Sequence, residues 1–356
     1  MYDPTKTYAE NYEKGPYGDY AIPIPYHNGG KPMHEFLGHP LYSRFGIPAG
    51  PLLNANYVSA AFAKGFDVVT YKTQRSIAFE ANPFPNVLYV DTGGDLTLKK
   101  AAKPVLGRTT APADPANISI TNSFAMPSTG PIYWVPDFKK AQAAVGRGQL
   151  LIMSVVGTIK PGYTASEYYD DFATVTKIAV QAGARVVELN LSCPNVANEG
   201  VLCYTPSAVI EICKRAKAVA GPTPLMIKIG YYTPEQEELL EDIVLRVARY
   251  IDGICAINTI SAPIVNERGE QALPGPNRLK SGVCGAGIKW AGLDMTRRLA
   301  AIRKKLNLKF KIVGVGGVMT PADYQEYLDA GADLVQSATG AMWNAELAID
   351  IKAAVK

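Results

Sequence analysis

From residue 45 onward, short apolar segments alternate regularly with longer amphipathic segments. The short segments have the length of β-strands, and the longer ones have the apolar period of α-helices. Eight segments are predicted to be strands: residues 46–50, 67–72, 150–156, 186–192, 225–229, 253–259, 311–315 and 333–337. Continuously apolar strands separated by helices are typical of a parallel sheet that is covered on its faces. The sequence therefore predicts an α/β fold, a (β/α)8 TIM barrel.

Two irregular insertions interrupt this alternation, residues 75–129 and the stretch from about 260 to 281. A long irregular stretch in a compact domain is usually functional, often a lid or a binding loop. A ninth candidate strand, residues 118–123, lies inside the first insertion. A doubly wound parallel sheet is the alternative fold, but no early strand is followed by the G-x-G-x-x-G turn that such folds use.

Residues 1–43 are rich in Tyr, Pro, Gly and His and show little periodicity. We expect an extended N-terminal arm that lies on the domain, and a barrel domain over residues 44–356. A flexible tail is the alternative for the arm. All three histidines lie in it, so proton transfer in the barrel must fall to Cys, Lys, Tyr, Asp or Glu.

The composition describes a soluble globular protein, with 47% hydrophobic residues and a net charge of +4. This charge is too small to indicate nucleic acid or an anionic membrane as a partner. No apolar run approaches the length of a membrane span, and the first residues do not form a signal peptide, so we expect a cytoplasmic protein. The five cysteines include no C-x-x-C pair, so no metal site is expected.

The sequence ELNLSCPN, which ends the fourth predicted strand, places polar side chains on one face. Glu188, Asn190 and Ser192 alternate with apolar residues and so point to the same side. Pro194 stops the strand and leaves the Cys193 thiol at its rim. A buried polar group without a partner costs roughly 1–3 kcal/mol, so these side chains need either a protein partner or a ligand. We favour a ligand.

The chemistry of such a barrel lies at the carboxyl ends of its strands. The last two strands end in small residues, Gly316-Gly317 and Ala338-Thr339, and each leads towards a helix. Backbone amides in such turns bind phosphate groups. A plain tight turn is the alternative for each, but the pair favours a phosphate site.

Two lysines, Lys72 and Lys228, end strands whose other residues are apolar. Burying an unpaired ammonium is costly, so each needs a partner. The partner is either an internal carboxylate such as Glu188 or an electron-rich cofactor. A set of amides at the same rim suits a planar ligand edged with imide groups, and it comprises Asn122, Asn190, Asn195 and Asn258.

Cys193 is the candidate acid or base at this rim, because an ordinary thiol pKa of roughly 8.5 allows proton transfer in either direction. Cys284, between glycines 282 and 285, is the rival reactive thiol. Cys255 lies within a strand and is expected to be part of the core.

The segment ELNLSCPNV, residues 188–196, resembles the signature of class 1 dihydroorotate dehydrogenases, FMN enzymes on a (β/α)8 barrel. The resemblance extends over roughly residues 44–350. It includes Thr70-Tyr71-Lys72-Thr73, Asn82-Pro83-Phe84-Pro85 and Asn122-Ser123, and also the strand ends at Lys228, Asn258-Thr259, Gly316-Gly317 and Ala338-Thr339.

This resemblance implies oxidation of dihydroorotate to orotate in pyrimidine biosynthesis, with FMN as the cofactor. It implies that Cys193 takes the proton from C5 while a hydride leaves C6, and that Lys72 lies at the reaction centre. The implied substrate-binding residues are Asn122, Asn190, Asn195, Asn258 and Thr259. The implied cofactor-binding residues are Ala49, Gly50, Lys72, Asn190, Lys228, Gly285, Gly316, Gly317, Ala338 and Thr339. A homodimer is expected, and an electron-transfer partner subunit is an open alternative to a small electron acceptor.

Several positions depart from the family pattern. Phe124-Ala125-Met126-Pro127-Ser128 stands where the family has M-G-L-P-N, and Asn86 stands where class 1 enzymes have arginine. The segment from Asn258 to Ser261 also resembles the FMN domain of dihydropyrimidine dehydrogenase, which acts on uracil-type rings. That activity is the second hypothesis. A third, of another class, is an aldolase or synthase that uses Lys228 as a Schiff base.

Overall fold

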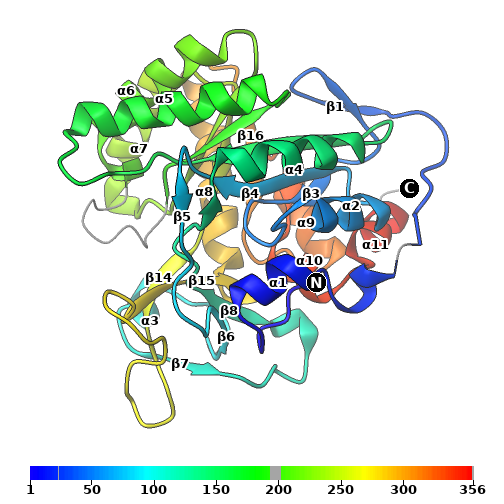
Figure 1. Ribbon diagram of the computed structural model, residues 1–356, viewed down its shortest axis with the longest axis vertical. Coiled ribbons are helices and arrows are strands. Elements are labelled where there is room, and N and C mark those ends of the chain that lie inside the picture. Colours follow the sequence, from blue (N-terminus) through cyan, green and yellow to red (C-terminus); the bar gives the residue numbers. More distant parts are fainter. Residues whose placement is uncertain (23, 193–201, 355–356) are drawn as a thin grey trace.

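Eight parallel strands close into a barrel in the computed structural model, which describes residues 1–22, 24–192 and 202–354. In order around the barrel they are β3 (Phe45–Ile47), β4 (Val68–Gln74), β10 (Leu150–Val155), β11 (Val187–Asn190), β12 (Leu225–Ile229), β13 (Gly253–Ala256), β16 (Lys311–Val315) and β17 (Leu334–Gln336). The predicted TIM barrel is confirmed, and each strand falls within or beside its predicted segment (Figure 1).

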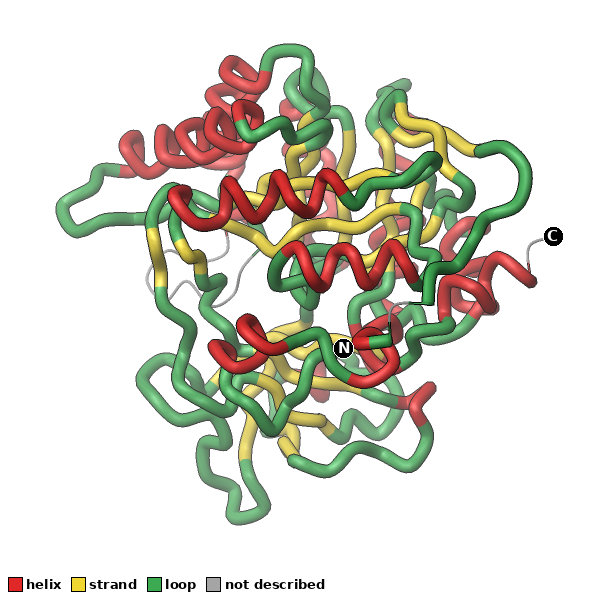
Figure 2. Tube along the Cα trace, turned by 45° about the vertical axis from the view of Figure 1, so that its right-hand side comes forward, coloured by secondary structure: helices red, strands yellow, loops and turns green. Residues whose placement is uncertain are grey.

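Helices follow the strands and cover the outside of the barrel (Figure 2). They are α2 (Ala55–Ala63), α4 (Pro131–Ala143), α5 (Ala165–Gln181), α6 (Pro206–Ala220), α7 (Glu237–Val247), α8 (Lys289–Lys305), α9 (Pro321–Asp329), α10 (Thr339–Trp343) and α11 (Leu347–Ala354). Helix α5 begins with a capping box, in which Thr164 and Glu167 are reciprocal partners. Helix α4 begins at Pro131, because proline is well tolerated in the first turn.

The two insertions are not irregular loops, as the sequence had led us to expect. They pair with each other in a second closed barrel of five strands, β14-β15-β8-β6-β7. These strands are β6 (Val87–Val90), β7 (Val105–Arg108), β8 (Ser119–Asn122), β14 (Ile260–Val265) and β15 (Lys280–Gly285). The first insertion also contains β5 (Ala78–Phe79), α3 (Leu98–Ala101), η2 (Pro115–Asn117) and β9 (Ser128–Thr129), and η5 (Ala286–Ile288) follows β15. The expectation was wrong because β8 pairs with β15, which lies far away in sequence and leaves no local hairpin signal.

A buried arginine links the two insertions. The Arg278 guanidinium donates to the carbonyl oxygens of Pro83 at 2.9 Å and Pro85 at 2.7 Å, and to the Ser123 hydroxyl at 3.0 Å. Arg278 comes from the second insertion and holds the N-P-x-P loop of the first. Asn86, where the family has arginine, instead donates to the Asn82 carbonyl at 2.9 Å.

The N-terminal arm is folded rather than extended throughout. It contains α1 (Tyr8–Lys14), a 3₁₀ turn η1 (Gly18–Ala21) and a hairpin of β1 (His34–Phe36) and β2 (His39–Leu41). Phe36 and Leu41 of the hairpin are fully buried against residues inside the main barrel, including Val68 and Leu150. The arm therefore contributes to the core. Among the described residues, no helix combines the length and apolar character needed to cross a membrane.

The last helix is tied to the barrel by a buried ion pair. Lys352 Nζ of α11 lies 2.8 Å from the Asp67 carboxylate, which is fully buried just before β4. Burial raises the pKa of Asp67 and lowers that of Lys352, so each charge depends on the other.

We predict that Lys352→Ala lowers the free energy of unfolding by about 3–5 kcal/mol, because it leaves a buried carboxylate without its counter-charge. Lys305→Ala is the matched control, since its pair with Glu241 is also 2.8 Å long but the lysine side chain is 66% exposed. The control should cost less than about 1 kcal/mol. Urea denaturation measures both, and equal losses would contradict the assignment.

Candidate functional site

A cavity lies at the carboxyl ends of the main barrel strands and is also lined by β8 and β15 of the second barrel. Its volume is about 1080 Å³, a value that includes the open mouth. Many of the predicted site residues line it: Ala49, Gly50, Lys72, Asn122, Asn190, Lys228, Asn258, Thr259, Gly285, Gly316, Gly317, Ala338 and Thr339. Cys193 and Asn195 lie outside the described residues.

Two nearly buried ammonium groups reach this cavity. Lys72, in β4, is 4% exposed, and Lys228, in β12, is 5% exposed. The Lys72 Nζ lies over the ring of Phe124, 5.6 Å from its centroid. The Lys228 Nζ lies 3.3 Å from the sulfur of Cys255. Two cations in such a confined space favour an anionic or electron-rich ligand.

A buried carboxyl group lies near Lys228. Glu188 is 1% exposed, and its Oε1 has no hydrogen-bond partner in the described part of the chain. Burial raises the pKa of Glu188 and outweighs the attraction of the Lys228 ammonium, which acts in the opposite direction. Burial also raises the pKa of Cys255 to about 12, so that this thiol is a neutral core group. Glu188 is thus an internal partner for the Lys228 charge, and a ligand in the cavity would be a second partner.

The amide side chains at the rim are only partly engaged. The Asn190 Oδ1 accepts a hydrogen bond from the Ser192 amide at 3.2 Å, and the one contact recorded for its NH₂ group with a described residue is the sulfur of Met126, at 3.5 Å. The Asn122 NH₂ group likewise faces a sulfur, that of Cys284, at 3.4 Å. Thioether and thiol sulfurs are weak acceptors, so these amides keep donors for a ligand.

Asn258 and Thr259, which follow β13, also have hydrogen-bonding groups that a ligand could use. The Asn258 NH₂ group donates to the Ser192 carbonyl at 3.3 Å. The neighbouring Thr259 Oγ1 is buried and has no hydrogen-bond partner among the described residues. A ligand in the cavity would satisfy this hydroxyl.

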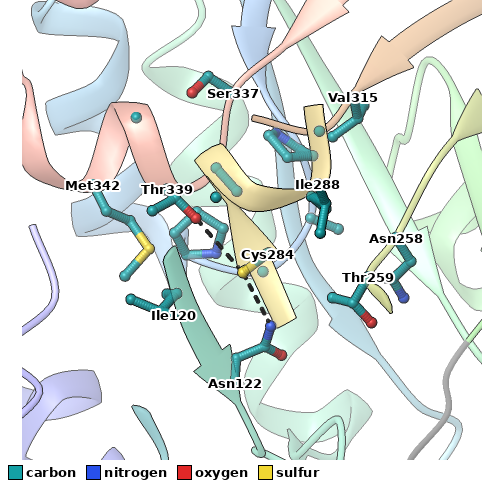
Figure 3. A pocket seen from close by; sticks show the side chains of 18 of the residues that line it. Ile120, Asn122, Asn258, Thr259, Cys284, Ile288, Val315, Ser337, Thr339 and Met342 are labelled. Carbon is teal, nitrogen blue, oxygen red and sulfur yellow. Dashed lines mark hydrogen bonds between the residues drawn. The ribbon is translucent and has the colours of Figure 1, made fainter. Parts of the chain in front are cut away.

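Cys284 lies in the middle of the cavity wall, on β15. Its sulfur is 3.4 Å from the Asn122 amide nitrogen and 3.5 Å from the Thr339 hydroxyl. Figure 3 shows it between these two residues, with Ile120 and Met342 towards one side. Sequence reasoning could not connect Cys284 with Asn122, because only the pairing of β15 with β8 brings them together.

A glycine turn after β16 brings backbone close to the cavity. Gly317 has a φ of 63°, and a Cβ atom there would lie 2.7 Å from the Cβ of Lys289. Only glycine fits both the backbone conformation and the space. The turn exposes main chain rather than side chain to the cavity, as a phosphate site requires.

An apolar group of lining residues was missed by sequence reasoning. It consists of Tyr2, Val87, Ile120, Phe124, Met126, Ile288 and Met342. The departure from the family pattern at Phe124 was the one signal available. Nothing in the sequence of the arm indicated that Tyr2 would reach the cavity.

Comparison with known proteins identifies the family. The profile described as "Dihydroorotate dehydrogenase" matches residues 110–355. A protein named "Dihydroorotate dehydrogenase" from Dictyostelium discoideum is 37% identical over 359 aligned residues, which cover 98% of this chain and 95% of that protein. This chain belongs to the dihydroorotate dehydrogenase family.

Two other family members are more distant. The "Dihydroorotate dehydrogenase B (NAD(+)), catalytic subunit" of Methanocaldococcus jannaschii is 28% identical over 62% of this chain and 65% of that protein. The "Dihydroorotate dehydrogenase A (fumarate)" of Lactiplantibacillus plantarum is 29% identical over 49% of this chain and 54% of that protein. All three relatives carry the name of a dihydroorotate dehydrogenase, and none that of a dihydropyrimidine dehydrogenase.

The cavity of this dihydroorotate dehydrogenase family member fits the flavin that the family uses. Two observations support the fit: the two buried lysines and the glycine turn at Gly317. Within the described ranges, no three His, Cys, Asp or Glu side chains gather in a metal-binding arrangement.

We predict a steep pH dependence for alkylation of Cys284. Burial raises the pKa of this thiol, and only the thiolate reacts, so the rate should keep rising at pH values where an ordinary thiol, with a pKa of about 8.5, is fully ionised and its rate has levelled off. Mass spectrometry of the peptide that contains Cys284 measures the rate, and the same peptide in the denatured protein is the reference. A rate that levels off below the reference would contradict the burial of the thiol.

Proposed function

We propose that this chain oxidises dihydroorotate to orotate with FMN as its cofactor. The observation that carries the proposal is a cavity at the carboxyl ends of the barrel strands, lined by Lys72, Lys228 and several amides, in a member of the dihydroorotate dehydrogenase family. Two cations and amide donors suit a planar, electron-rich ring system.

The cofactor would be held at both of its ends. Amides of the turns at Gly316-Gly317 and Ala338-Thr339 would bind its phosphate, and Gly285, Ala49 and Gly50 would allow close approach of the backbone. Lys72, Lys228 and Asn190 would donate to its ring system. When bound, the flavin supplies the chemistry of a hydride acceptor for C6 of the substrate.

The substrate would lie against the amide set of the rim. Asn122, Asn258 and Thr259, together with Asn195 outside the described residues, would hold its imide edge and carboxylate. The carboxylate distinguishes dihydroorotate from uracil-type rings, and the nearby lysine ammonium groups offset its negative charge. The residues of the chain thus orient the ring and fix the position of C5.

Cys193 would act as the base. Its thiolate would take the proton from C5 while a hydride leaves C6, so that the C5–C6 single bond becomes a double bond. An ordinary thiol pKa near 8.5 suits this task at neutral pH, whereas Cys203, Cys213 and Cys255 are buried and have pKa values raised to about 12. We expect the electrons to leave to a small acceptor or a partner subunit, since the names of the relatives include both fumarate and NAD(+). We also expect a homodimer.

The purified protein tests this function directly. It should be yellow and release FMN on denaturation, and anaerobic dihydroorotate should bleach its flavin absorbance while dihydrouracil leaves it unchanged. Bleaching by dihydrouracil alone would support the dihydropyrimidine hypothesis instead. A colourless protein that borohydride traps with a carbonyl substrate at Lys228 would support the aldolase or synthase hypothesis.

We predict that Cys193→Ala retains FMN and loses about 10²–10⁴-fold in turnover, because a positioned acid or base typically contributes that factor. Cys213→Ala is the matched control, since this thiol is fully buried in α6, does not line the cavity and has no part in the proposed reaction. Stopped-flow reduction of the flavin by dihydroorotate gives both rates. Near-normal reduction in the Cys193 variant would refute the assigned base.

A further inference from the structure

The N-terminal arm reaches the cavity through one aromatic side chain. Tyr2 lines the cavity and is only 6% exposed. Its ring packs edge-on against Phe124, with 5.5 Å between ring centroids and 77° between planes. Phe124 is the residue whose ring lies beneath the Lys72 ammonium. Tyr2 of the arm, Phe124 and Lys72 therefore contact one another in sequence along the cavity wall.

Hydrogen bonds hold the arm in this position. The Tyr20 hydroxyl donates to the carbonyl of Ala341 in α10 at 2.7 Å. The Tyr57 hydroxyl of α2 donates to the Asn11 carbonyl at 2.8 Å, and the amide of Tyr17 donates to the carbonyl of Met1 at 2.9 Å. In both Figure 1 and Figure 2, α1 lies between the main barrel and the second barrel. The arm is thus part of the folded wall.

Both polar and apolar side chains line the cavity. Lys72, Lys228, Asn122, Asn190 and Asn258 are polar, and an apolar group comprises Tyr2, Val87, Ile120, Phe124, Met126, Ile288 and Met342. In Figure 3, Ile120 and Met342 lie on one side of Cys284, and Asn258, Thr259 and Ile288 lie on the other. A flavin ring system needs both kinds of contact, since one end carries imide-like polar groups and the other is a methylated benzene ring.

The hydroxyl of Tyr2, which is buried, also lacks a hydrogen-bond partner among the described residues. Burial raises its pKa, so it stays neutral. A buried hydroxyl without a partner is unfavourable, and a bound ligand would supply either an acceptor or a compensating contact.

We propose that the N-terminal arm is a wall of the cofactor site and that Tyr2 contacts the flavin ring system. This assignment rests on the proposed function, in which FMN is the cofactor. The family profile begins at residue 110, so the arm lies outside the segment it matches. The arm therefore gives this chain a cofactor contact that the matched segment does not contain.

Tyr2→Ala in the full-length chain tests the assignment. It should weaken FMN binding about 10- to 100-fold, because it removes one buried aromatic ring from the cavity wall. Tyr2→Phe keeps the ring and should stay within about fivefold of the wild type. The dissociation constant is measured from the fluorescence of released FMN, and iodide quenching of the bound flavin should increase in Tyr2→Ala alone.

Tyr8→Ala is the matched control. The Tyr8 ring also packs on Phe124, at 5.7 Å, but Tyr8 does not line the cavity. Its variant should bind FMN within about threefold of the wild type. Circular dichroism checks that all variants are folded.

Two results would overturn the assignment while leaving the proposed function intact. The first is an FMN affinity in Tyr2→Ala equal to that of the wild type. The second is an equal loss of FMN affinity in Tyr2→Ala and Tyr8→Ala, which would show that both variants act through the packing of Phe124. If the wild-type chain itself fails to bind FMN, the cofactor proposal falls, and the role of Tyr2 falls with it.

Discussion

Closure of the parallel barrel is the constraint on which the rest of the structure depends. Each strand pairs in parallel with both of its neighbours, so every barrel strand points the same way and ends at the same rim. The register places Asn190 beside Lys228, and Lys228 beside Cys255. Polar side chains that are distant in sequence therefore meet at the rim. Buried apolar side chains such as Leu150, Ile152 and Val313 lie below them, and this low-dielectric surrounding strengthens any electrostatic interaction with a ligand.

The second barrel turns this open rim into a cavity. Its strands come from two insertions, and their pairing positions Asn122 of β8 and Cys284 of β15 over the carboxyl ends of the main strands. Arg278 ties the insertions together through main-chain carbonyl groups. The arm adds Tyr2 from a third part of the chain. Three segments that lie far apart in the sequence thus enclose one cavity.

The cavity gathers positive charge in one place. Lys72 and Lys228 bring two nearly buried ammonium groups to it, and burial raises the pKa of Glu188, a buried carboxyl near Lys228. Burial of these charges favours an anionic or electron-rich ligand. The local arrangement of charge, rather than the small net charge of +4, gives the cavity this preference.

The sequence by itself determined the main barrel, the strand ends and most of the polar cavity residues, because strand period, helix caps and turn residues are local properties of the chain. Lys72, Asn190, Lys228 and the glycine turn could be identified in this way. Only the tertiary structure decided the second barrel, the position of Cys284 beside Asn122, and the contact of Tyr2 with Phe124. These depend on pairing and packing between segments far apart in sequence. Such contacts leave no period or motif in either segment, since each becomes favourable only when the barrel has closed.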